Sequence, residues 1–229
     1  MKQKELPIQE NVSTRDKVLY AAASLFWEKG YEKTAIVDIA ARAGVNRGSV
    51  LFAIKSKENL LRTLVSYVLE STFSSSASLV GETGDPVLSY AVESALQLYM
   101  AESREEVREM AAAAYTLPTT SELIYHKAAK RLSELFQPCN PDWEERDFYE
   151  REIASGSIMR GYMARPCDLY FTMERKMRVF LETTLAIYHV PEEKAGEAMQ
   201  FLSGFDFEDI AERAMKTMID VLKTKHFPT

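Results

Sequence analysis

The side chains best placed for chemistry lie between residues 46 and 57, in the stretch NRGSVLFAIKSK. Asn46, Arg47 and Ser49 open a segment with helical spacing, and Lys55 and Lys57 follow it. Amide, guanidinium and hydroxyl groups bond to the base edges of DNA, and lysine ammonium groups bind its phosphates. The chemistry expected of this stretch is therefore recognition of nucleic acid rather than cleavage of a bond.

Motifs that would support catalysis are missing from the sequence. It contains no phosphate loop of the GxGxxG or GxxxxGK[ST] kind and no GxSxG nucleophile elbow. No metal-ligand spacing connects its histidines and cysteines, which are His126, His189, His226, Cys139 and Cys167. One pair, Glu122 and His126, is four residues apart, which is more typical of a surface contact than of a metal site. We expect no enzyme activity, no bound metal and no cofactor.

Three short helices are expected to position the polar stretch. The spacing of apolar residues predicts helices over residues 15–29, 35–43 and 46–53. Thr14, Thr34 and Asn46 are the expected N-caps, and Gly44 permits a tight turn between the second and third helices. This arrangement is a helix-turn-helix, whose last helix enters the major groove of DNA. An ordinary three-helix core with a charged rim is the alternative.

The rest of the chain also has helical periodicity. A long helix is expected over 57–80, capped by Ser56 and weakened by serines near its far end, and the loop GETGDP follows at 81–86. Further helices are expected over about 86–102, 104–116, 121–136, 142–164, 168–188, 191–203 and 206–224. The prolines of this region fall between these segments, and no strand pattern occurs. The expected fold class is all-α, with three short helices followed by a larger helical bundle.

The charge is divided unevenly along the chain. Residues 1–60 carry ten basic and seven acidic residues, a balance of +3, whereas the remainder has a balance of −9. A polyanion is expected to meet the first part and to be repelled by the second. The N-terminus lacks the apolar core of a signal peptide, and no apolar run approaches the roughly 18–20 residues of a membrane span. We expect a cytoplasmic protein with two reduced cysteines and no membrane partner.

A longer motif around the helix-turn-helix resembles a known family. The run AASLFWEKGYEKTAIVDIAARAGVNRGSV, followed by KSKENLL, is similar to the N-terminal domain of TetR-family transcriptional regulators. The resemblance covers about residues 14–61. It implies a dimeric bacterial repressor, or occasionally an activator, whose C-terminal helical domain binds a small molecule. We accordingly expect a DNA-binding domain over 1–60 and a ligand-binding and dimerisation domain over 61–229.

The resemblance also implies which side chains face DNA, with some departures in this sequence. The expected contacts are Thr34, Ala35, Asn46, Arg47, Ser49, Leu51, Phe52, Lys55 and Lys57. The family usually has an aromatic residue at the position of Leu51, often histidine at Ala53 and phenylalanine at Ile54, and frequently a basic residue at Val37. Two accounts follow. In the favoured one, Leu51 and Phe52 contact thymine methyl groups while Arg47 reads guanine; in the other, DNA affinity has become weak.

The second part of the chain is rich in tyrosine and methionine, which line adaptable apolar pockets as well as ordinary cores. The resemblance places a ligand pocket between the helices of about 86–136 and the start of 142–164. The expected lining residues are Tyr99, Met110, Tyr115, Tyr125, Met159 and Tyr162. Gly156 and Gly161 fall in one helix, which suggests close approach of another backbone or of a ligand.

Dimerisation and regulation follow as hypotheses. The resemblance assigns 142–164 and 168–188 to a two-fold interface; packing of these helices against 206–224 is the alternative. A dimer would read a palindrome-like operator. A ligand that tilts 57–80 would change the spacing of the two heads and lower DNA affinity. The alternative function is a helical small-molecule-binding or enzyme-like protein whose head has lost operator reading, as Val37, Leu51 and Ala53 suggest.

Overall fold

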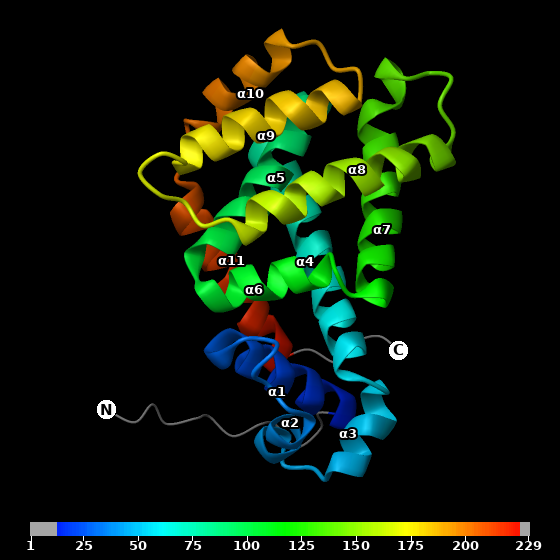
Figure 1. Cartoon of the computed structure of the whole chain (residues 1–229), viewed down its shortest axis with the longest axis vertical. Helices are drawn as coiled ribbons and strands as arrows, with labels where there is room; N and C mark the ends of the chain where they lie inside the picture. Colours follow the sequence, from blue (N-terminus) through cyan, green and yellow to red (C-terminus); the bar gives the residue numbers. More distant parts are fainter. Residues whose placement is uncertain (1–12, 225–229) are drawn as a thin grey trace.

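The computed structural model of the 229-residue chain describes residues 13–224, and side chains as far as residue 221. Within this range the chain forms eleven α-helices, two short 3-10 helices and no strand. The helices are α1 Thr14–Lys29, α2 Ile36–Ala43, α3 Arg47–Ile54, α4 Lys57–Val80, α5 Pro86–Ser103, α6 Glu105–Ala114, α7 Pro118–Phe136, α8 Glu145–Ala164, α9 Met173–Ile187, α10 Glu193–Leu202 and α11 Phe207–Thr224 (Figure 1). The predicted all-α architecture is confirmed.

Helices α1, α2 and α3 form a head at one end of the molecule (Figure 1). Its core gathers buried side chains from all three helices and from the start of α4, including Val18, Phe26, Ile39, Val50, Leu60, Leu61 and Leu64. Leucines of α4 complete this core, so the start of α4 packs as part of the head. The predicted domain boundary after residue 60 stays a prediction.

Side-chain caps set the starts of several helices. Asn46 caps α3 and Ser56 caps α4, as expected: each side-chain oxygen accepts a hydrogen bond from the backbone N–H three residues later. At α1 the prediction was wrong, because Ser13 rather than Thr14 is the N-cap. The Ser13 hydroxyl oxygen accepts from the backbone of Asp16 at 3.2 Å, which satisfies a donor of the first turn.

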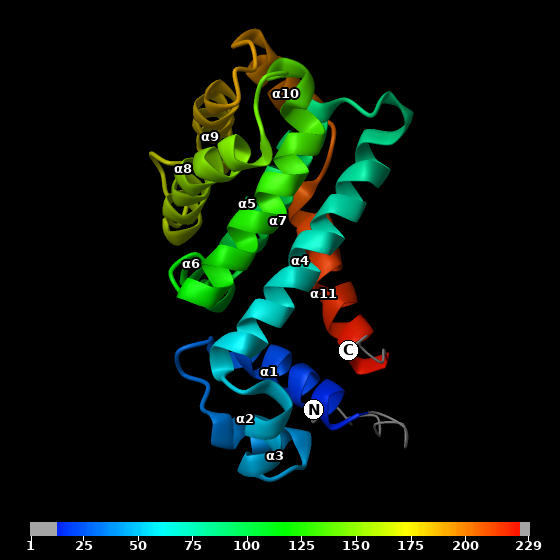
Figure 2. The same ribbon diagram turned by 90° about the vertical axis from the view of Figure 1, so that its right-hand side faces the viewer.

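Helix α4 joins the head to the rest of the molecule, which we call the body (α5–α11). It packs against α5 and α7 of the body as well as against α1 and α3 of the head, and it runs obliquely from one to the other (Figure 2). Its serine-rich end remains helical as far as Val80. Ser76 is buried there and its hydroxyl donates to the Ser89 carbonyl at 3.1 Å, so this serine attaches α4 to α5 instead of weakening the helix.

The body is built around α5. Ala91, Val92, Ala95 and Leu96 of this helix have no exposed surface, because α4, α6, α7, α8, α10 and α11 all pack against it. Helices α8 and α9 pack against each other and form one flank of the body (Figure 2). At the other side, α11 reaches back to contact α1. The head therefore touches the body through α4, α6 and α11.

Three helix starts lie three or more residues from their predicted positions. Helix α8 begins at Glu145 rather than near residue 142. Helix α7 begins at Pro118, three residues earlier than expected, because proline fits the first helical turn, where its missing N–H has no partner to lose. Helix α9 begins at Met173 rather than near residue 168. Asp168 accepts hydrogen bonds from the backbone N–H groups of Tyr170 and Phe171, both at 2.8 Å, so residues 168–171 form a turn.

Candidate functional site

Helix α3 presents one face to the head core and the other to solvent. Val50 and Ile54 are buried, whereas Arg47 is exposed at the N-terminal end, as a recognition helix requires. Asn46 Oδ1 accepts from the backbone N–H of Ser49 at 2.8 Å, and its amide nitrogen remains a donor. The N-terminal half of α3 thus offers an amide, a guanidinium and a hydroxyl to a groove of DNA.

The same surface carries unusually exposed apolar side chains. Phe52 is 93% exposed, Val37 on α2 is 56% exposed and Leu51 is 37% exposed. Large apolar side chains left in water mark contact surfaces when they gather in one place. In the described part of the chain, every other exposed large apolar residue lies on α8, α9 or the loop between them: Ile153, Leu169, Tyr170 and Val179. The structure therefore has two such surfaces, one on the head and one on the α8–α9 flank.

Thr34 lies inside the head rather than on its DNA side. It is 1% exposed, and its hydroxyl donates to the Gly30 carbonyl at 2.7 Å. It also does not cap α2: Ala35 is the N-cap, and its N–H donates to the carboxylate of Asp38 at 3.0 Å. The prediction of Thr34 as a cap and as an exposed contact was wrong because its hydroxyl holds the turn between α1 and α2. Ala35 is exposed as expected.

The two lysines beyond α3 differ in their surroundings. Lys55 is exposed and ends α3 with a φ of 65°. Lys57 is partly buried: its Nζ donates to the Tyr31 carbonyl at 3.0 Å and lies 4.2 Å from the centre of the Tyr31 ring. Lys57 therefore contributes to holding α4 on the head, whereas Lys55 is free to meet a phosphate.

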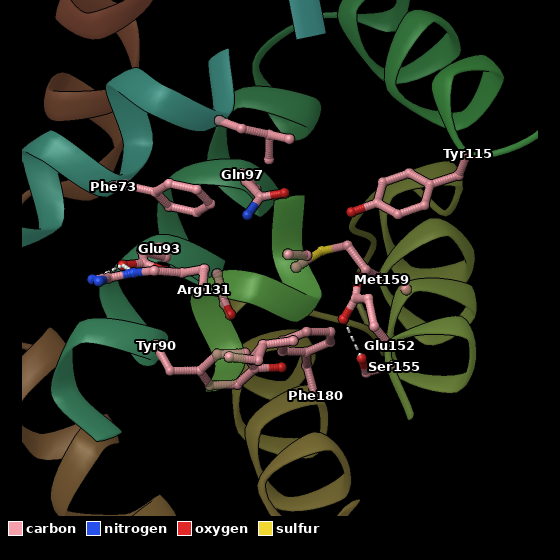
Figure 3. Close-up of a pocket in the computed structure, with 15 residues that line it drawn as sticks. Phe73, Tyr90, Glu93, Gln97, Tyr115, Arg131, Glu152, Ser155, Met159 and Phe180 are labelled. Atoms are coloured by element: carbon pink, nitrogen blue, oxygen red, sulfur yellow. Dashed lines mark hydrogen bonds and ion pairs between the residues drawn. The ribbon is translucent and has the colours of Figure 1, made fainter. Parts of the chain in front are cut away.

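Two neighbouring cavities of the body lie against α4, and we call them the polar cavity and the apolar cavity. The polar cavity has a volume of about 50 Å³ and lies between α4, α5, α7, α8 and α9 (Figure 3). Its polar lining comes from Glu93, Gln97, Arg131, Glu152 and Ser155, and its rings from Phe73, Tyr90, Tyr115 and Phe180. The apolar cavity, of about 100 Å³, shares Leu69, Gln97 and Tyr115 with it.

An ion pair closes one side of the polar cavity. Arg131 on α7 donates through Nε and Nη2 to Glu93 Oε1 on α5, at 3.0 and 2.7 Å. Burial raises the pKa of the Glu93 carboxyl, while the hydrogen bonds from Arg131 oppose that rise. The guanidinium also lies 5.5 Å from the centre of the Phe73 ring. The pair thus links α5 to α7 with its charges mutually compensated.

Glu152 on α8 is the second buried carboxyl of the polar cavity. Its Oε2 accepts from the Ser155 hydroxyl at 2.6 Å and from the Tyr188 hydroxyl at 3.3 Å. Burial raises the pKa of Glu152 to about 7, and the two hydroxyl donors only moderate that rise. At neutral pH this carboxyl is therefore poised between its neutral and charged forms.

The apolar cavity reaches from the body to the head. It is lined by methionines of α5, α6, α8 and α11, by Val65 and Val68 of α4, and by Trp27 of α1. The Arg104 guanidinium lies 4.9 Å from the centre of the Trp27 ring. A residue of the helix-turn-helix head thus forms part of the cavity wall.

Three of the predicted ligand residues line these cavities and three do not. Met110, Tyr115 and Met159 are cavity residues. The others pack elsewhere: Tyr99 stacks on Phe207, Tyr125 meets Tyr149 edge to face, and Tyr162 meets Phe171 and Phe180. Their role as ligand contacts stays a prediction without support from the cavity geometry.

The charged residues of the polar cavity were not among the ligand-site residues predicted from the sequence. Glu152 falls at the spacing of Phe148, Ser155 and Met159, which together form the buried face of α8. A carboxyl at an apolar helical register is the signal that would have identified it. Glu93, at a buried register of α5, gives the same signal.

The head of this chain matches a known family model. Residues 18–64, which run from α1 into α4, match the model of bacterial regulatory proteins of the tetR family. Over these residues the chain is therefore similar to the N-terminal domain of that family, and the described part of the chain has an all-α fold. The helix-turn-helix predicted from the motif is confirmed.

Several curated relatives are transcriptional repressors. KstR2 of Mycolicibacterium smegmatis is 31% identical over 125 residues, which cover 55% of this chain and 54% of the relative. BepR of Brucella suis is 26% identical over 101 residues, or 43% and 48% of the two chains. KstR2 of Mycobacterium tuberculosis is 29% identical over 161 residues, or 69% and 72%. The chain thus spans about half the length of the first two relatives.

Solved structures share the fold at low identity. RolR in complex with resorcinol has a TM-score of 0.63 and 15% identity, over 81% of this chain and 92% of that chain. SmeT, the repressor of the Stenotrophomonas maltophilia multidrug efflux pump SmeDEF, has a TM-score of 0.54 and 20% identity, over 76% and 89%. Among the helices of residues 13–224, none is long and apolar enough to cross a membrane.

Proposed function

We propose that this chain is a ligand-responsive transcriptional regulator that binds operator DNA as a homodimer and acts as a repressor in the cytoplasm. One observation carries the proposal: α4 completes the core of the head and also lines both cavities of the body. Leu60 and Leu61 fix its start in the head, while Val65, Leu69 and Phe73 face the cavities. A ligand that moves α4 would therefore move the head.

The proposed DNA surface is the exposed side of the helix-turn-helix. Asn46, Arg47 and Ser49 supply polar groups for base edges and Lys55 a charge for a phosphate. Ala35 lies at the start of α2. When a helix-turn-helix binds DNA, its first helix crosses the DNA backbone, so Ala35 would lie close to a phosphate. Leu51 and Phe52 supply apolar contacts, for which thymine methyl groups are the matching partners. Thr34 and Lys57 support this surface from within.

The proposed dimer forms through the α8–α9 flank. Ile153 on α8 and Val179 on α9 are exposed there, and Leu169 and Tyr170 extend the apolar surface at one end. A Cβ at Gly161 would meet no atom within 4 Å, so the chain itself leaves open space at this glycine. Small and apolar residues on one helix face permit close approach of a second helix pair. Two heads related in this way would read half-sites ~34–36 Å apart.

The proposed effector site is the polar cavity together with the apolar cavity. The effector would bind there without being chemically changed. Two proteins of this fold have been solved with small aromatic molecules, RolR with resorcinol and SmeT with triclosan. Because Trp27 belongs to the head and lines the apolar cavity, an occupant of that cavity would contact the head directly as well as through α4. A coupling of ~1–3 kcal/mol between ligand and DNA is typical of such regulators.

The test is selection of binding sequences from random duplex DNA with the purified protein, followed by affinity measurements at several salt concentrations. Enrichment of a two-fold symmetric motif is expected. Arg47→Ala should weaken binding to that motif by ~1–3 kcal/mol, because a guanidinium can bind guanine through two hydrogen bonds. Arg146→Ala, at an exposed arginine on α8, is the matched control and should leave DNA affinity unchanged. Equal effects of the two substitutions would contradict the proposed surface.

A second function is supported by the exposed apolar residues of the head. Val37, Leu51 and Ala53 stand where regulators of this kind usually present basic, aromatic or histidine side chains, and Val37 and Leu51 are exposed in the structure. A head of this composition suits a helical small-molecule-binding protein that no longer reads an operator. Failure of random-sequence selection at low salt, together with ligand binding by the body, would favour this second function over the first.

A further inference from the structure

The two oxygens of the buried Glu152 carboxyl have different surroundings in the polar cavity. Both hydrogen bonds that it receives end on Oε2, from Ser155 and Tyr188. The other oxygen, Oε1, lies beside Gly156: a Cβ added to that glycine would stand 3.0 Å from it. Figure 3 shows Glu152 and Tyr115 on the same side of the cavity, with Arg131 across from them. One oxygen of a buried carboxyl is therefore left for a donor inside the cavity.

The charges around the cavity favour a cationic occupant over an anionic one. Arg131 is the cationic side chain among the residues that line the polar cavity, and it already donates twice to Glu93. Glu152 is the second carboxyl, so the lining has two acids for one base. An anion would have to compete with Glu93 for Arg131 and would also face Glu152. A cation meets a carboxyl that no lining cation neutralises.

The rings of the cavity point to the same ligand chemistry. Phe73, Tyr90, Tyr115 and Phe180 line it from four different elements. Aromatic faces attract ammonium groups, and the attraction grows when water is excluded. A carboxyl oxygen surrounded by rings is the combination with which proteins hold organic cations. The methionine-rich apolar cavity lies next to it, beyond Leu69 and Gln97.

We propose that the polar cavity binds a small organic cation, an apolar amine whose ammonium group donates to Glu152 Oε1 while its hydrocarbon part extends toward the apolar cavity. This inference rests on the proposed function, since it names the chemical class of the effector of the same site. Methionine side chains adapt their shape readily, so Met159 of the polar cavity and the methionines of the apolar cavity can make room for such a molecule.

The titration of Glu152 supplies an independent signature of cation binding. The groups that face Glu152 are Tyr90 of α5, Tyr115 at the end of α6, Tyr125 of α7 and Tyr188 at the end of α9, with the Glu93–Arg131 pair across the cavity. Burial raises the pKa of Tyr90, Tyr115 and Tyr188, so these groups stay neutral at pH 7. A bound ammonium therefore acts on the proton of Glu152, whose pKa of about 7 it would lower.

The experiment is calorimetric titration of the full-length protein with three probes of matched shape: phenethylamine, phenethyl alcohol and phenylacetate. The amine should bind at least about tenfold more tightly than the alcohol, a typical size for a desolvated cation–ring contact with a carboxyl partner. Phenylacetate should bind more weakly than either. Repeating the amine titration in buffers of different ionisation enthalpy at pH 7 should show release of protons, because the raised pKa of Glu152 keeps part of its carboxyl protonated there.

Two variants assign the effect to one carboxyl. Glu152→Gln keeps the shape and removes the charge, so it should abolish both the preference for the amine and the proton release. Glu150→Gln changes an exposed carboxyl of the same helix and should preserve both. Circular dichroism and DNA affinity of the unliganded variants establish that each is folded.

The outcomes separate this inference from the proposed function. Equal or tighter binding of the alcohol or of phenylacetate by the wild-type protein overturns the cation assignment, and so does the absence of any binding of the amine. Neither result depends on a variant that folds. In those cases, selection of a two-fold operator would still support the regulator, whereas selective amine binding with no operator would support a cation-binding protein without DNA recognition.

Discussion

Glu58 in the first turn of α4 accepts two hydrogen bonds from Thr119 in the first turn of α7, from the backbone N–H at 2.8 Å and from the hydroxyl at 2.6 Å. The hydroxyl is the main reason that the pKa of Glu58 lies below its usual value. The carboxylate also lies at the positive end of α7, where a negative charge is favoured. Residues that are 61 positions apart thus join the base of the connecting helix to the body.

Glu58→Ala should therefore loosen α4 at its base. We expect the free energy of unfolding to fall by about 1 kcal/mol at neutral pH, since hydrogen bonds to a charged acceptor are lost. Because the folded pKa of Glu58 is lowered, its contribution is present above the usual carboxyl range and is lost as the pH falls. Urea denaturation at pH 7 measures the effect, with Glu82→Ala at an exposed glutamate after α4 as the control. Equal stability of the two variants would contradict the prediction.

The two lysines after α3 should separate DNA contact from stability. Lys55→Ala should reduce the slope of log affinity against log salt concentration by about 1, with an unchanged free energy of unfolding, because Lys55 is exposed. Lys57→Ala should leave the salt slope unchanged and lower the free energy of unfolding. It removes the hydrogen bond to the Tyr31 carbonyl and the contact with the Tyr31 ring, for a loss of about 1 kcal/mol of stability.

The check is a salt series of operator affinity together with a denaturation curve for each variant. Each lysine serves as the control for the other, since the side chains are identical and two positions apart. A reduced salt slope in Lys57→Ala with unchanged stability would return Lys57 to the DNA surface.

Glu152 should make the stability of the protein depend on pH. An unfolded glutamate ionises near pH 4.5, whereas burial holds the folded carboxyl protonated to about pH 7. The folded state therefore binds the extra proton, and the free energy of unfolding falls as the pH rises through this window. The loss from this one group is of the order of 1–3 kcal/mol and is complete above pH 7.

Glu152→Gln removes the ionisation, so its stability relative to the wild type should rise between pH 4.5 and pH 7. The measurement is a set of urea denaturation curves across that range, with Glu150→Gln on the exposed side of α8 as the reference. Parallel pH profiles of the wild type and Glu152→Gln would show that folding leaves the pKa of Glu152 unchanged, which would contradict the prediction.

The helices could largely be predicted from the sequence because each buries one face, and a repeat of three to four residues records that face directly. The predicted helix starts were wrong where a side chain bonds to the nearby backbone and so ends or caps a helix at a residue that the apolar repeat does not mark. Ser13 takes the cap expected of Thr14, and Asp168 turns a stretch with apolar Leu169 and Tyr170 into a loop. Such competition depends on backbone geometry, which periodicity does not encode.

The residues of the proposed DNA surface could be grouped from the sequence more readily than those of the cavities. Its residues lie close together in the sequence, so a motif brings Asn46, Arg47 and Phe52 together before any tertiary structure is known. The polar cavity instead combines Glu93 and Arg131, which are 38 positions apart, with Glu152 from a third helix. Gly156 shows the same limit: close approach of another backbone or of a ligand was expected, whereas its neighbours are the side chains of Glu152, Tyr115 and Tyr125.

The α8–α9 flank should be the surface that holds two copies of the chain together. Ile153→Glu and Val179→Glu each place a charge on an exposed apolar position, so the fold of one chain should be unaffected while a buried interface would be disrupted. We expect the double variant to sediment as a monomer. It should also lose most of its operator affinity, because two linked heads bind a two-fold site far more tightly than one head does. Lys130→Glu, at an exposed position on α7, is the control for added negative charge and should sediment as the wild type does. A double variant that remains dimeric with full operator affinity would move the interface to another face of the body.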